Sequence, residues 1–354
     1  MQHAKTHRAR RLCIMTLSLF CVSIALHASS AADDSRKERQ TSANEPTRDA
    51  WRERMWATET PATGCFRTAY PDMTWHEVPC KPPSPQPFSS LARGPAGTSP
   101  AAGGPQGYIL RAPLSAHLAK VTGSFPSVTG VTSVSTEGGG TNGWGPNQYS
   151  LQISSNAGST AACGDRPNCA VWQQFVYSTR FPFQDSGPVL LMDTWLFNYG
   201  RPCPTGWWDF YPDCQKPTGQ HAAPLIPITD LAKVQLTGTA DKNGKRQAIL
   251  QYGDELYTVS DDASILNIAD MWTDAEFNVY GNGGGSEAVF NPGSSLTVKA
   301  TALYDNLQLS IYAPKCVTSD NAMTGETNNL NLGNCIAGGY PASDYPYVQF
   351  TESN

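Results

Sequence analysis

The chain has 354 residues, a net charge of −5 and only 16% charged residues, together with 31 Gly and 27 Pro. So little charge is unusual for a helical protein and is typical of a secreted all-β protein with many turns. Outside the N-terminal leader there is no block of basic residues, so the composition argues against a nucleic-acid partner.

The N-terminus has the pattern of a secretory signal. Basic residues lie between Lys5 and Arg11, an apolar run covers 12–26, and small residues occupy 28–32. This order predicts a signal peptide over 1–32, with the mature chain beginning near Ala32 or Asp33. The apolar run is shorter than the roughly 20 residues that a membrane span needs. We therefore expect a secreted protein, extracellular or periplasmic, with no membrane contact after cleavage; an uncleaved anchor is the alternative.

Two of the ten cysteines fall inside the signal, which leaves eight for an oxidising compartment. They form four couples close in sequence: Cys65 with Cys80, Cys163 with Cys169, Cys203 with Cys214, and Cys316 with Cys335. Sequential disulfides are the simplest of the 105 pairings that eight cysteines allow. The chain has no C-x-x-C, and only two histidines follow Tyr108, so we expect no metal site and no cofactor.

The segment 82–107 is rich in Pro, Gly, Ser and Ala and predicts a linker. It divides the mature chain into an N-terminal extension or pro-segment, 33–107, and a main domain, 108–354. The extension is weakly helical at best over 33–59, and an aromatic block follows at 64–80. It carries equal numbers of acidic and basic residues, whereas the main domain has 12 Lys and Arg against 21 Asp and Glu. An acidic domain suits an acidic medium, where its carboxylates repel one another less.

Short segments with strand patterns follow one another through the main domain. They cover 121–134, 149–154, 171–179, 189–199, 232–239, 246–252, 255–259, 275–280, 288–290, 296–303, 307–313 and 347–351. The glycines of 281–285 predict a hairpin between 275–280 and 288–290, and 265–272 predicts one short helical turn. Short strands at this spacing, each with one apolar face, predict an all-β fold of the β-sandwich class.

The main domain offers few groups for catalysis. His117 and His221 are its only imidazoles, neither lies beside a G-x-S-x-G motif, and pairing every cysteine leaves no thiol nucleophile. Paired carboxylates remain, as in glycoside hydrolysis. Glu276 and Glu287 flank the glycine turn, but the expected hairpin puts Glu287 opposite Tyr280, so these two carboxyls are too far apart to act together.

Three strand motifs resemble the glutamic peptidases of the eqolisin family. The first is Ala275-Glu-Phe-Asn-Val-Tyr280, followed by the glycine turn, Ala288-Val-Phe-Asn291 and Ser294-Ser-Leu-Thr-Val298. It resembles the Ala-Glu-Trp strand with the family's catalytic glutamate. Thr194-Trp-Leu-Phe-Asn-Tyr199 resembles the family's tryptophan-rich strand, and Trp172-Gln-Gln-Phe-Val176 stands where the family has its catalytic glutamine.

The resemblance implies a lectin-like (concanavalin-type) antiparallel double-sheet β-sandwich made with a cleavable pro-segment. It also implies a secreted endopeptidase that acts in acid on polypeptides. Glu276 would be the base that activates water, and a glutamine amide would stabilise the oxyanion. This chain differs from the family pattern at Phe277, which replaces a tryptophan, and at Phe197, which replaces a glutamate. The insertion 201–227 has no counterpart in that pattern.

Alternation along the strand decides which glutamine is available. If Phe175 and Tyr177 face the core, Gln174 faces outward beside Trp172, which favours Gln174 over Gln173 without excluding the latter. Trp172 and Trp195 are candidate substrate-binding residues on the two neighbouring strands. By the same alternation, Glu276 lies on the face opposite Ala275, Phe277 and Val279.

A second interpretation is a non-catalytic lectin-like module. The 203–214 loop carries Trp207-Trp-Asp-Phe-Tyr211, which we expect to be an exposed aromatic cluster of the kind that stacks on sugars or peptides; the alternative is that these rings cover the edge of the sandwich. Trp207 and Trp208 are therefore candidate binding residues for a glycan or a peptide. An inert adhesion module is a third interpretation. Cleavage of the pro-segment would favour the peptidase.

Overall fold

The computed structural model describes residues 47–84, 88, 107–113, 115–139, 145–180, 187–319, 324–341, 343 and 345–354. The predicted signal peptide and most of the predicted linker lie outside these residues. By its contacts the chain divides into two compact units, Met1–Glu53 and Arg54–Asn354. Helix α2 (Arg48–Ala57) begins in the first unit and ends in the second, and Thr47 caps its start, since the Thr47 hydroxyl accepts the Ala50 N–H at 3.3 Å.

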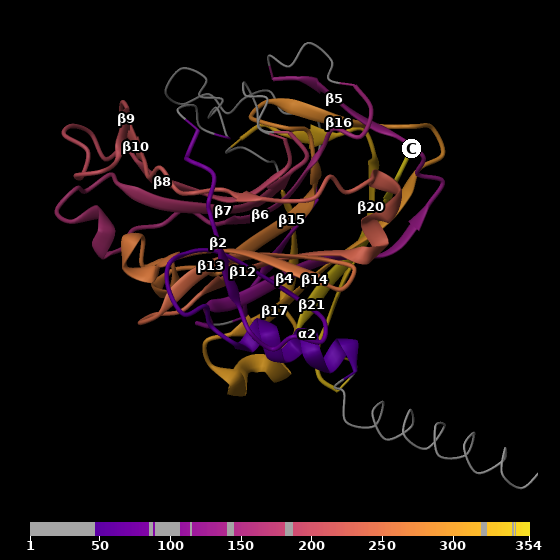
Figure 1. Cartoon of the computed structure of the whole chain (residues 1–354), viewed down its shortest axis with the longest axis horizontal. Coiled ribbons are helices and arrows are strands. Elements are labelled where there is room, and N and C mark those ends of the chain that lie inside the picture. Colours follow the sequence, from indigo (N-terminus) through magenta and orange to yellow (C-terminus); the bar gives the residue numbers. More distant parts are fainter. Residues whose placement is uncertain are drawn as a thin grey trace, which may run out of the picture. The chain divides into compact units, whose positions relative to one another are not determined.

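The second unit is an all-β sandwich of two large antiparallel sheets (Figure 1). The first sheet runs in the order β2 (His76–Val78), β1 (Gly64–Ala69), β14 (Glu255–Asp262), β13 (Lys245–Tyr252), β12 (Val234–Ala240), β4 (Leu118–Thr129), β17 (Ser295–Tyr304), β21 (Tyr347–Ser353), β20 (Asn331–Gly338). The second runs β18 (Lys315–Ser319), β3 (Gly107–Arg111), β15 (Asp274–Tyr280), β6 (Ser150–Ser155), β7 (Ala170–Ser178), β8 (Val189–Phe197), β10 (Asp213–Gln215), β9 (Trp208–Phe210), with β11 (His221–Ala222) also on β8.

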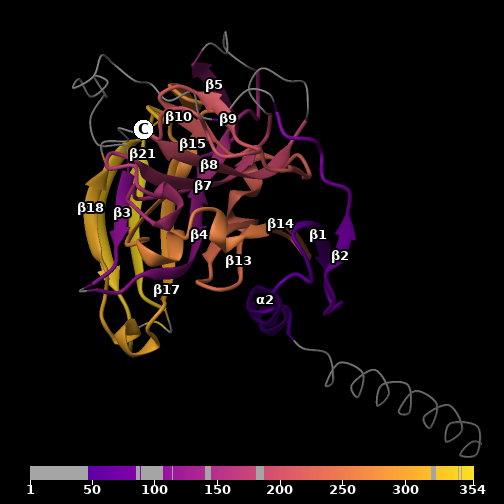
Figure 2. The same cartoon turned by 90° about the vertical axis from the view of Figure 1, so that its left-hand side faces the viewer.

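A small third sheet has the order β19 (Thr327–Asn328), β16 (Ser286–Phe290), β5 (Val134–Gly138). Short 3₁₀ helices complete the described residues: η1 (Ala161–Cys163), η2 (Ile228–Lys233), η3 (Ala263–Ile265), η4 (Ile268–Asp270) and η5 (Leu307–Ile311). Figure 2 shows β1 and β2 at one side of the sandwich, beyond β14, and β18 and β3 at the other.

The core lies between the two large sheets, and glycines bring the sheets close together. A Cβ on Gly123 of β4 would lie 2.2 Å from the ring of Phe277 on β15. A Cβ on Gly238 of β12 would lie 2.4 Å from the ring of Phe175 on β7. Each ring therefore packs where the facing strand has no side chain. These contacts fix which face of β7 and of β15 is the inner one.

The four sequential disulfides are confirmed, each local in the chain: Cys65–Cys80, Cys163–Cys169, Cys203–Cys214 and Cys316–Cys335. Four disulfides are typical of proteins made for an oxidising compartment. No helix in the described part of the chain is long and apolar enough to cross a membrane.

Two predicted elements are wrong. The glycine turn does not close a hairpin: β15 pairs with β3 and β6, whereas β16 pairs with β5 and β19 in the small sheet. Glu287 accordingly lies opposite Glu137, not opposite Tyr280. The segment 307–313 is the 3₁₀ helix η5 rather than a strand. The hairpin pattern was overridden by pairing with distant segments. The helix η5 is instead local: the Asn306 side chain caps its start by accepting the Gln308 N–H, and none of its residues is buried.

Candidate active site

The outer face of the second sheet, the face turned away from the core, carries one continuous row of polar side chains. Glu276 of β15 pairs with Ser154 of β6, Ser154 with Gln174 of β7, and Gln174 with Asp193 of β8. Directly paired residues project to the same face of a sheet. Strands about 4.8 Å apart place the Cα atoms of Glu276 and Gln174 roughly 10 Å apart. Ser154, with a small side chain, holds the strand position between them.

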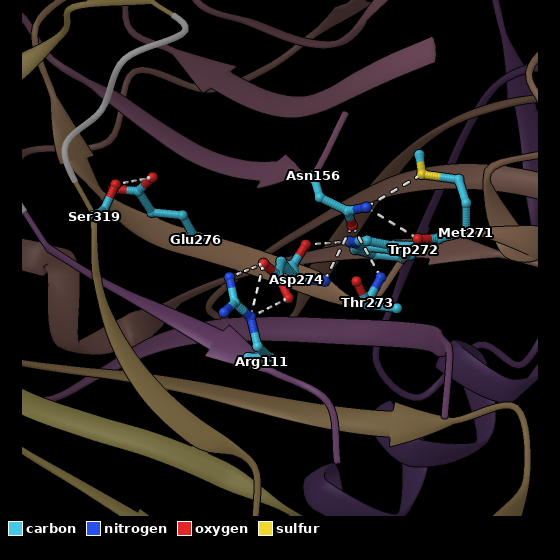
Figure 3. Close-up of polar contacts among 8 residues, drawn as sticks. All are labelled: Arg111, Asn156, Met271, Trp272, Thr273, Asp274, Glu276 and Ser319. Atoms are coloured by element: carbon cyan, nitrogen blue, oxygen red, sulfur yellow. Dashed lines mark hydrogen bonds and ion pairs between the residues drawn. The ribbon is translucent and has the colours of Figure 1, made fainter. Parts of the chain in front are cut away.

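The start of β15 is anchored by a side chain from the end of β6. Asn156 accepts the N–H groups of Thr273 and Asp274 at 2.9 and 3.1 Å and donates to the Met271 carbonyl at 3.0 Å. Asp274 is also held by the guanidinium of Arg111 on β3, at 2.7 Å. Figure 3 shows this cluster beside Glu276. These contacts fix the register of β15 and so the position of Glu276 in the row.

The Glu276 carboxylate is oriented by two hydroxyl donors. Tyr280 donates to Oε1 and Ser319 of β18 donates to Oε2, both at 2.7 Å, and Figure 3 shows the Ser319 contact. Such bonds stabilise the ionised carboxyl group. Burial, with the Glu276 charge second, raises the pKa of Tyr280, which keeps this phenol a donor. Gly107 makes room, because a Cβ there would lie 3.2 Å from Glu276 Oε1.

The two adjacent glutamines have different surroundings. Gln174 lies in the outer row, and its amide nitrogen donates to Gln152 Oε1 at 2.8 Å and to Ser154 Oγ at 3.0 Å. Gln173 points to the core, where its Oε1 accepts from Arg246 and from the Thr194 hydroxyl. Gln173 therefore lies on the opposite face of the sheet from Glu276, whereas Gln174 shares its row.

Arg246 lies fully buried between the two sheets. Its guanidinium donates to Thr194 Oγ1 at 2.9 Å and to Asp261 Oδ2 at 3.0 Å, in addition to Gln173. Burial lowers the pKa of Arg246, and the Asp261 charge opposes that shift. The side chain links β13 of the first sheet to β7 and β8 of the second. The Gln173 amide thus serves to satisfy a buried cation.

Aromatic rings flank the row at the Gln174–Asp193 end. Trp172 pairs with Trp195, two residues along each strand from the Gln174–Asp193 pair. Both indoles pack on Phe197, with ring centroids 5.6 and 6.1 Å away. Phe210 packs on Trp195 at 5.6 Å. Both tryptophans are buried, and within the described residues neither indole N–H has an acceptor. The pair forms a wall with two available donors beside the row.

The other two candidate tryptophans lie apart from this pair. Trp207 is half-buried and packs against the main core. Trp208 of β9 is half-buried and, with Asp193 and Gln215, lines a shallow depression. In this aromatic segment Tyr211 is the ring that solvent reaches most, at 66% exposure. Trp207 and Trp208 are therefore half-buried rather than exposed, contrary to the expectation of an exposed cluster.

Sequence reasoning missed Glu326, a fully buried carboxyl near the row. The pKa of Glu326 is raised to about 8, chiefly by burial; hydrogen bonds with Gln152 and Thr324 oppose the shift, and the charges of Asp193 and Glu276 add to it. Glu326 is therefore neutral in acid and adds no charge beside Glu276 there. Nothing in its local sequence marks it, because the chain just before β19 is brought to the row only by tertiary packing.

In the described part of the chain, no three His, Cys, Asp or Glu side chains are arranged to hold a metal ion.

A second buried carboxyl, Glu352 of β21, predicts how stability depends on pH. Burial raises its pKa to about 7, despite bonds from Asn278 at 3.0 Å and Asn328 at 3.3 Å. Both Glu326 and Glu352 keep protons in the native state that the unfolded chain releases above about pH 4.5. The native state binds more protons over this range, so the free energy of unfolding falls as pH rises toward 8.

We expect the melting temperature at constant ionic strength to fall steadily from pH 5 to pH 8. Glu352→Gln should flatten this fall, because an amide cannot lose a proton. Glu287→Gln, a change at a half-buried carboxyl in the small sheet, should leave the slope unchanged. Thermal unfolding followed by circular dichroism measures all three, and a melting temperature that rises between pH 5 and pH 8 would contradict the assignment.

No family model matches this chain, and no curated protein matches it. Among solved structures, the chain is similar to scytalido-glutamic peptidase bound to a peptide-based transition-state analogue, at 14% identity, 70% of this chain, 96% of that chain and a TM-score of 0.26. It is also similar to SCP-B, a member of the eqolisin family of peptidases, in complex with the tripeptide Ala-Ile-His, at 13% identity, 69% and 96% coverage and a TM-score of 0.25. Similarity at this level shows nothing about the chemistry, which depends on the side chains of the row.

Proposed function

We propose that the protein is a secreted, acid-acting endopeptidase of the glutamic type, with Glu276 and Gln174 as its catalytic residues. The observation that carries the proposal is the row Glu276–Ser154–Gln174 on the outer face of the second sheet. A carboxylate and a primary amide lie in this row on either side of a serine, from adjacent positions of β15, β6 and β7. Asp193 and the tryptophan wall close one end of the row.

In the proposed reaction, the Glu276 carboxylate takes a proton from water as the water oxygen attacks the scissile carbonyl carbon. The Gln174 N–H that now points to Ser154 Oγ turns to the carbonyl oxygen and stabilises its developing negative charge. Glu276 then gives its proton to the leaving nitrogen as the C–N bond breaks, which restores the carboxylate. Two products leave, a carboxylic acid and an amine.

An acidic working range follows from the groups at hand. A carboxylate base unaided by imidazole is best matched to acidic solution, because glutamic acids lose their protons near pH 4.3. Glu326 is protonated in that range, so the row carries less negative charge in acid than at pH 8 and above. The four disulfides and the N-terminal signal pattern support secretion.

Glycan binding through the aromatic loop has less support. Stacking on a sugar needs an open ring face, but Trp207 and Trp208 are half-buried. Tyr211 is exposed, and its ring already has the Arg201 guanidinium 5.0 Å from its centroid. We therefore place the function at the row rather than at the loop.

The test is cleavage of an acid-denatured protein by the purified secreted chain at pH 3 to 5. We expect the parent to cleave the substrate, Glu276→Gln to lose at least about 10³-fold in kcat/KM, and Glu287→Gln to match the parent. Equal activity of the parent and Glu276→Gln would refute the proposed base. An inert parent whose N-terminal extension stays attached at every acidic pH would refute the peptidase function.

A further inference from the structure

Phe88, from the predicted N-terminal extension, is buried on the outer face of the second sheet. Its ring is 1% exposed and packs in a separate apolar cluster with Val176 of β7 and with Val189 and Leu191 of β8. The extension thus places one aromatic side chain against the sheet that carries the proposed active site.

The cluster of Phe88, Val176, Val189 and Leu191 adjoins the Gln174–Asp193 end of the row. Val176 is two residues beyond Gln174 on β7, and Leu191 is two residues before Asp193 on β8. Val176 and Leu191 are paired with each other and are the next pair on the same face after Gln174–Asp193. Residues two apart on a strand share a face and lie about 7 Å apart. The ring of Phe88 therefore lies about one side chain away from the proposed oxyanion donor.

The chain leading to Phe88 is held against the edge of the same sheet. Lys81 and Gln220 exchange backbone hydrogen bonds of 2.7 and 3.1 Å, just before β11. Pro83, Ser84 and Phe88 then line the shallow depression that also contains Asp193 and Leu191. Val176, Val189 and Leu191 thus form an apolar contact site for one ring, and the ring of Phe88 from this same chain occupies it.

We propose that Val176, Val189 and Leu191 form a subsite for a large apolar side chain of a polypeptide substrate, and that Phe88 occupies this subsite and blocks it in the intact chain. This proposal rests on the proposed function, because the subsite takes a substrate side chain only if the protein is a peptidase. It also gives the extension a role, because the site accepts a substrate side chain only after Phe88 has left. Burial of Gln174 and Asp193, each 1% exposed, is what a covered site requires.

The experiment measures binding rather than cleavage, in a Glu276→Gln background where the proposed base is removed. The probe is a fluorescent octapeptide with one central phenylalanine, compared with the same peptide carrying alanine, by fluorescence anisotropy at pH 4.5. Three full-length chains are compared: the chain with Phe88 intact, Phe88→Ala, which leaves the contact site unoccupied, and Phe88→Leu, which keeps a large apolar side chain in it. Near-ultraviolet circular dichroism checks that each is folded, and Phe88→Val replaces Phe88→Ala if the latter is not.

We expect Phe88→Ala to bind the phenylalanine peptide at least about tenfold more tightly than the intact chain does, and at least about tenfold more tightly than it binds the alanine peptide. Phe88→Leu should resemble the intact chain. Equal affinities of folded Phe88→Ala for the two peptides, or no gain over the intact chain, overturn the subsite. Because cleavage is not the readout, a chain that never cleaves protein can still show the binding difference, so the two proposals fail separately.

Discussion

Gln174→Ala should lower kcat/KM for an acid-denatured protein by about 10²–10³-fold, because removal of one preorganised oxyanion donor typically costs that much. The loss should fall on kcat more than on KM, since the charge that this amide stabilises develops only in the transition state. Steady-state kinetics with a quenched-fluorescence peptide at pH 3 to 5 measures both quantities.

The adjacent glutamine is the matched control for this change. Gln173→Ala removes an amide of the same size from the same strand, but on the inner face, where it contacts Arg246 and Thr194. We expect it to lower the melting temperature and to leave kcat/KM of the folded fraction within about threefold of the parent, well inside the loss expected for a donor. If Gln173→Ala instead removed activity while Gln174→Ala did not, the assignment of the two faces to their roles would be wrong.

Arg246→Met should lower the free energy of unfolding by about 3 to 5 kcal/mol, the usual effect of removing one partner from a buried ion pair. Methionine fills part of the space, but the Gln173 carbonyl and the Thr194 hydroxyl lose a buried donor. The Asp261 side chain is 23% exposed, so water recovers part of its interaction and the loss should lie toward the lower value. Urea unfolding at pH 5 measures the change.

Arg111→Met provides the comparison, because Arg111 makes an ion pair with Asp274 near the surface of the same sandwich. Its side chain is 47% exposed, and exposed pairs contribute about 1 kcal/mol or less. Similar losses for the two variants would mean that Arg246 is not the inter-sheet link described above.

The Gln173 and Gln174 variants separate the two faces of β7. Side chains of β7 alternate between a core that joins the sheets and an outer row that faces the proposed substrate. Neighbouring residues with the same chemistry therefore have different consequences: Gln173 is expected to affect folding and Gln174 to affect catalysis. Alternation along a strand is local geometry, which is why the sequence already favoured Gln174 once Phe175 and Tyr177 were placed in the core.

Prediction from sequence succeeded for the disulfides and for the strands that carry the proposed site, whose decisive patterns are local. The strand around Glu276 follows from apolar residues at every second position, the strand around Gln174 from aromatic and β-branched residues, and the disulfides join cysteines 6 to 19 residues apart. The sandwich class follows from the number and spacing of such strands. In each case neighbours in the chain carry the information.

Contacts between distant segments were decided only by the tertiary structure. The glycine turn after β15 predicts a hairpin, yet β16 finds its partners in β5 and β19, because a turn cannot specify pairing when other edges compete for the strand. The same holds for the row itself: Ser154 between Glu276 and Gln174, Glu326 near them and Phe88 on the adjoining patch come from separate parts of the chain. No periodicity records which strands become neighbours, since that choice depends on the packing of the whole sheet.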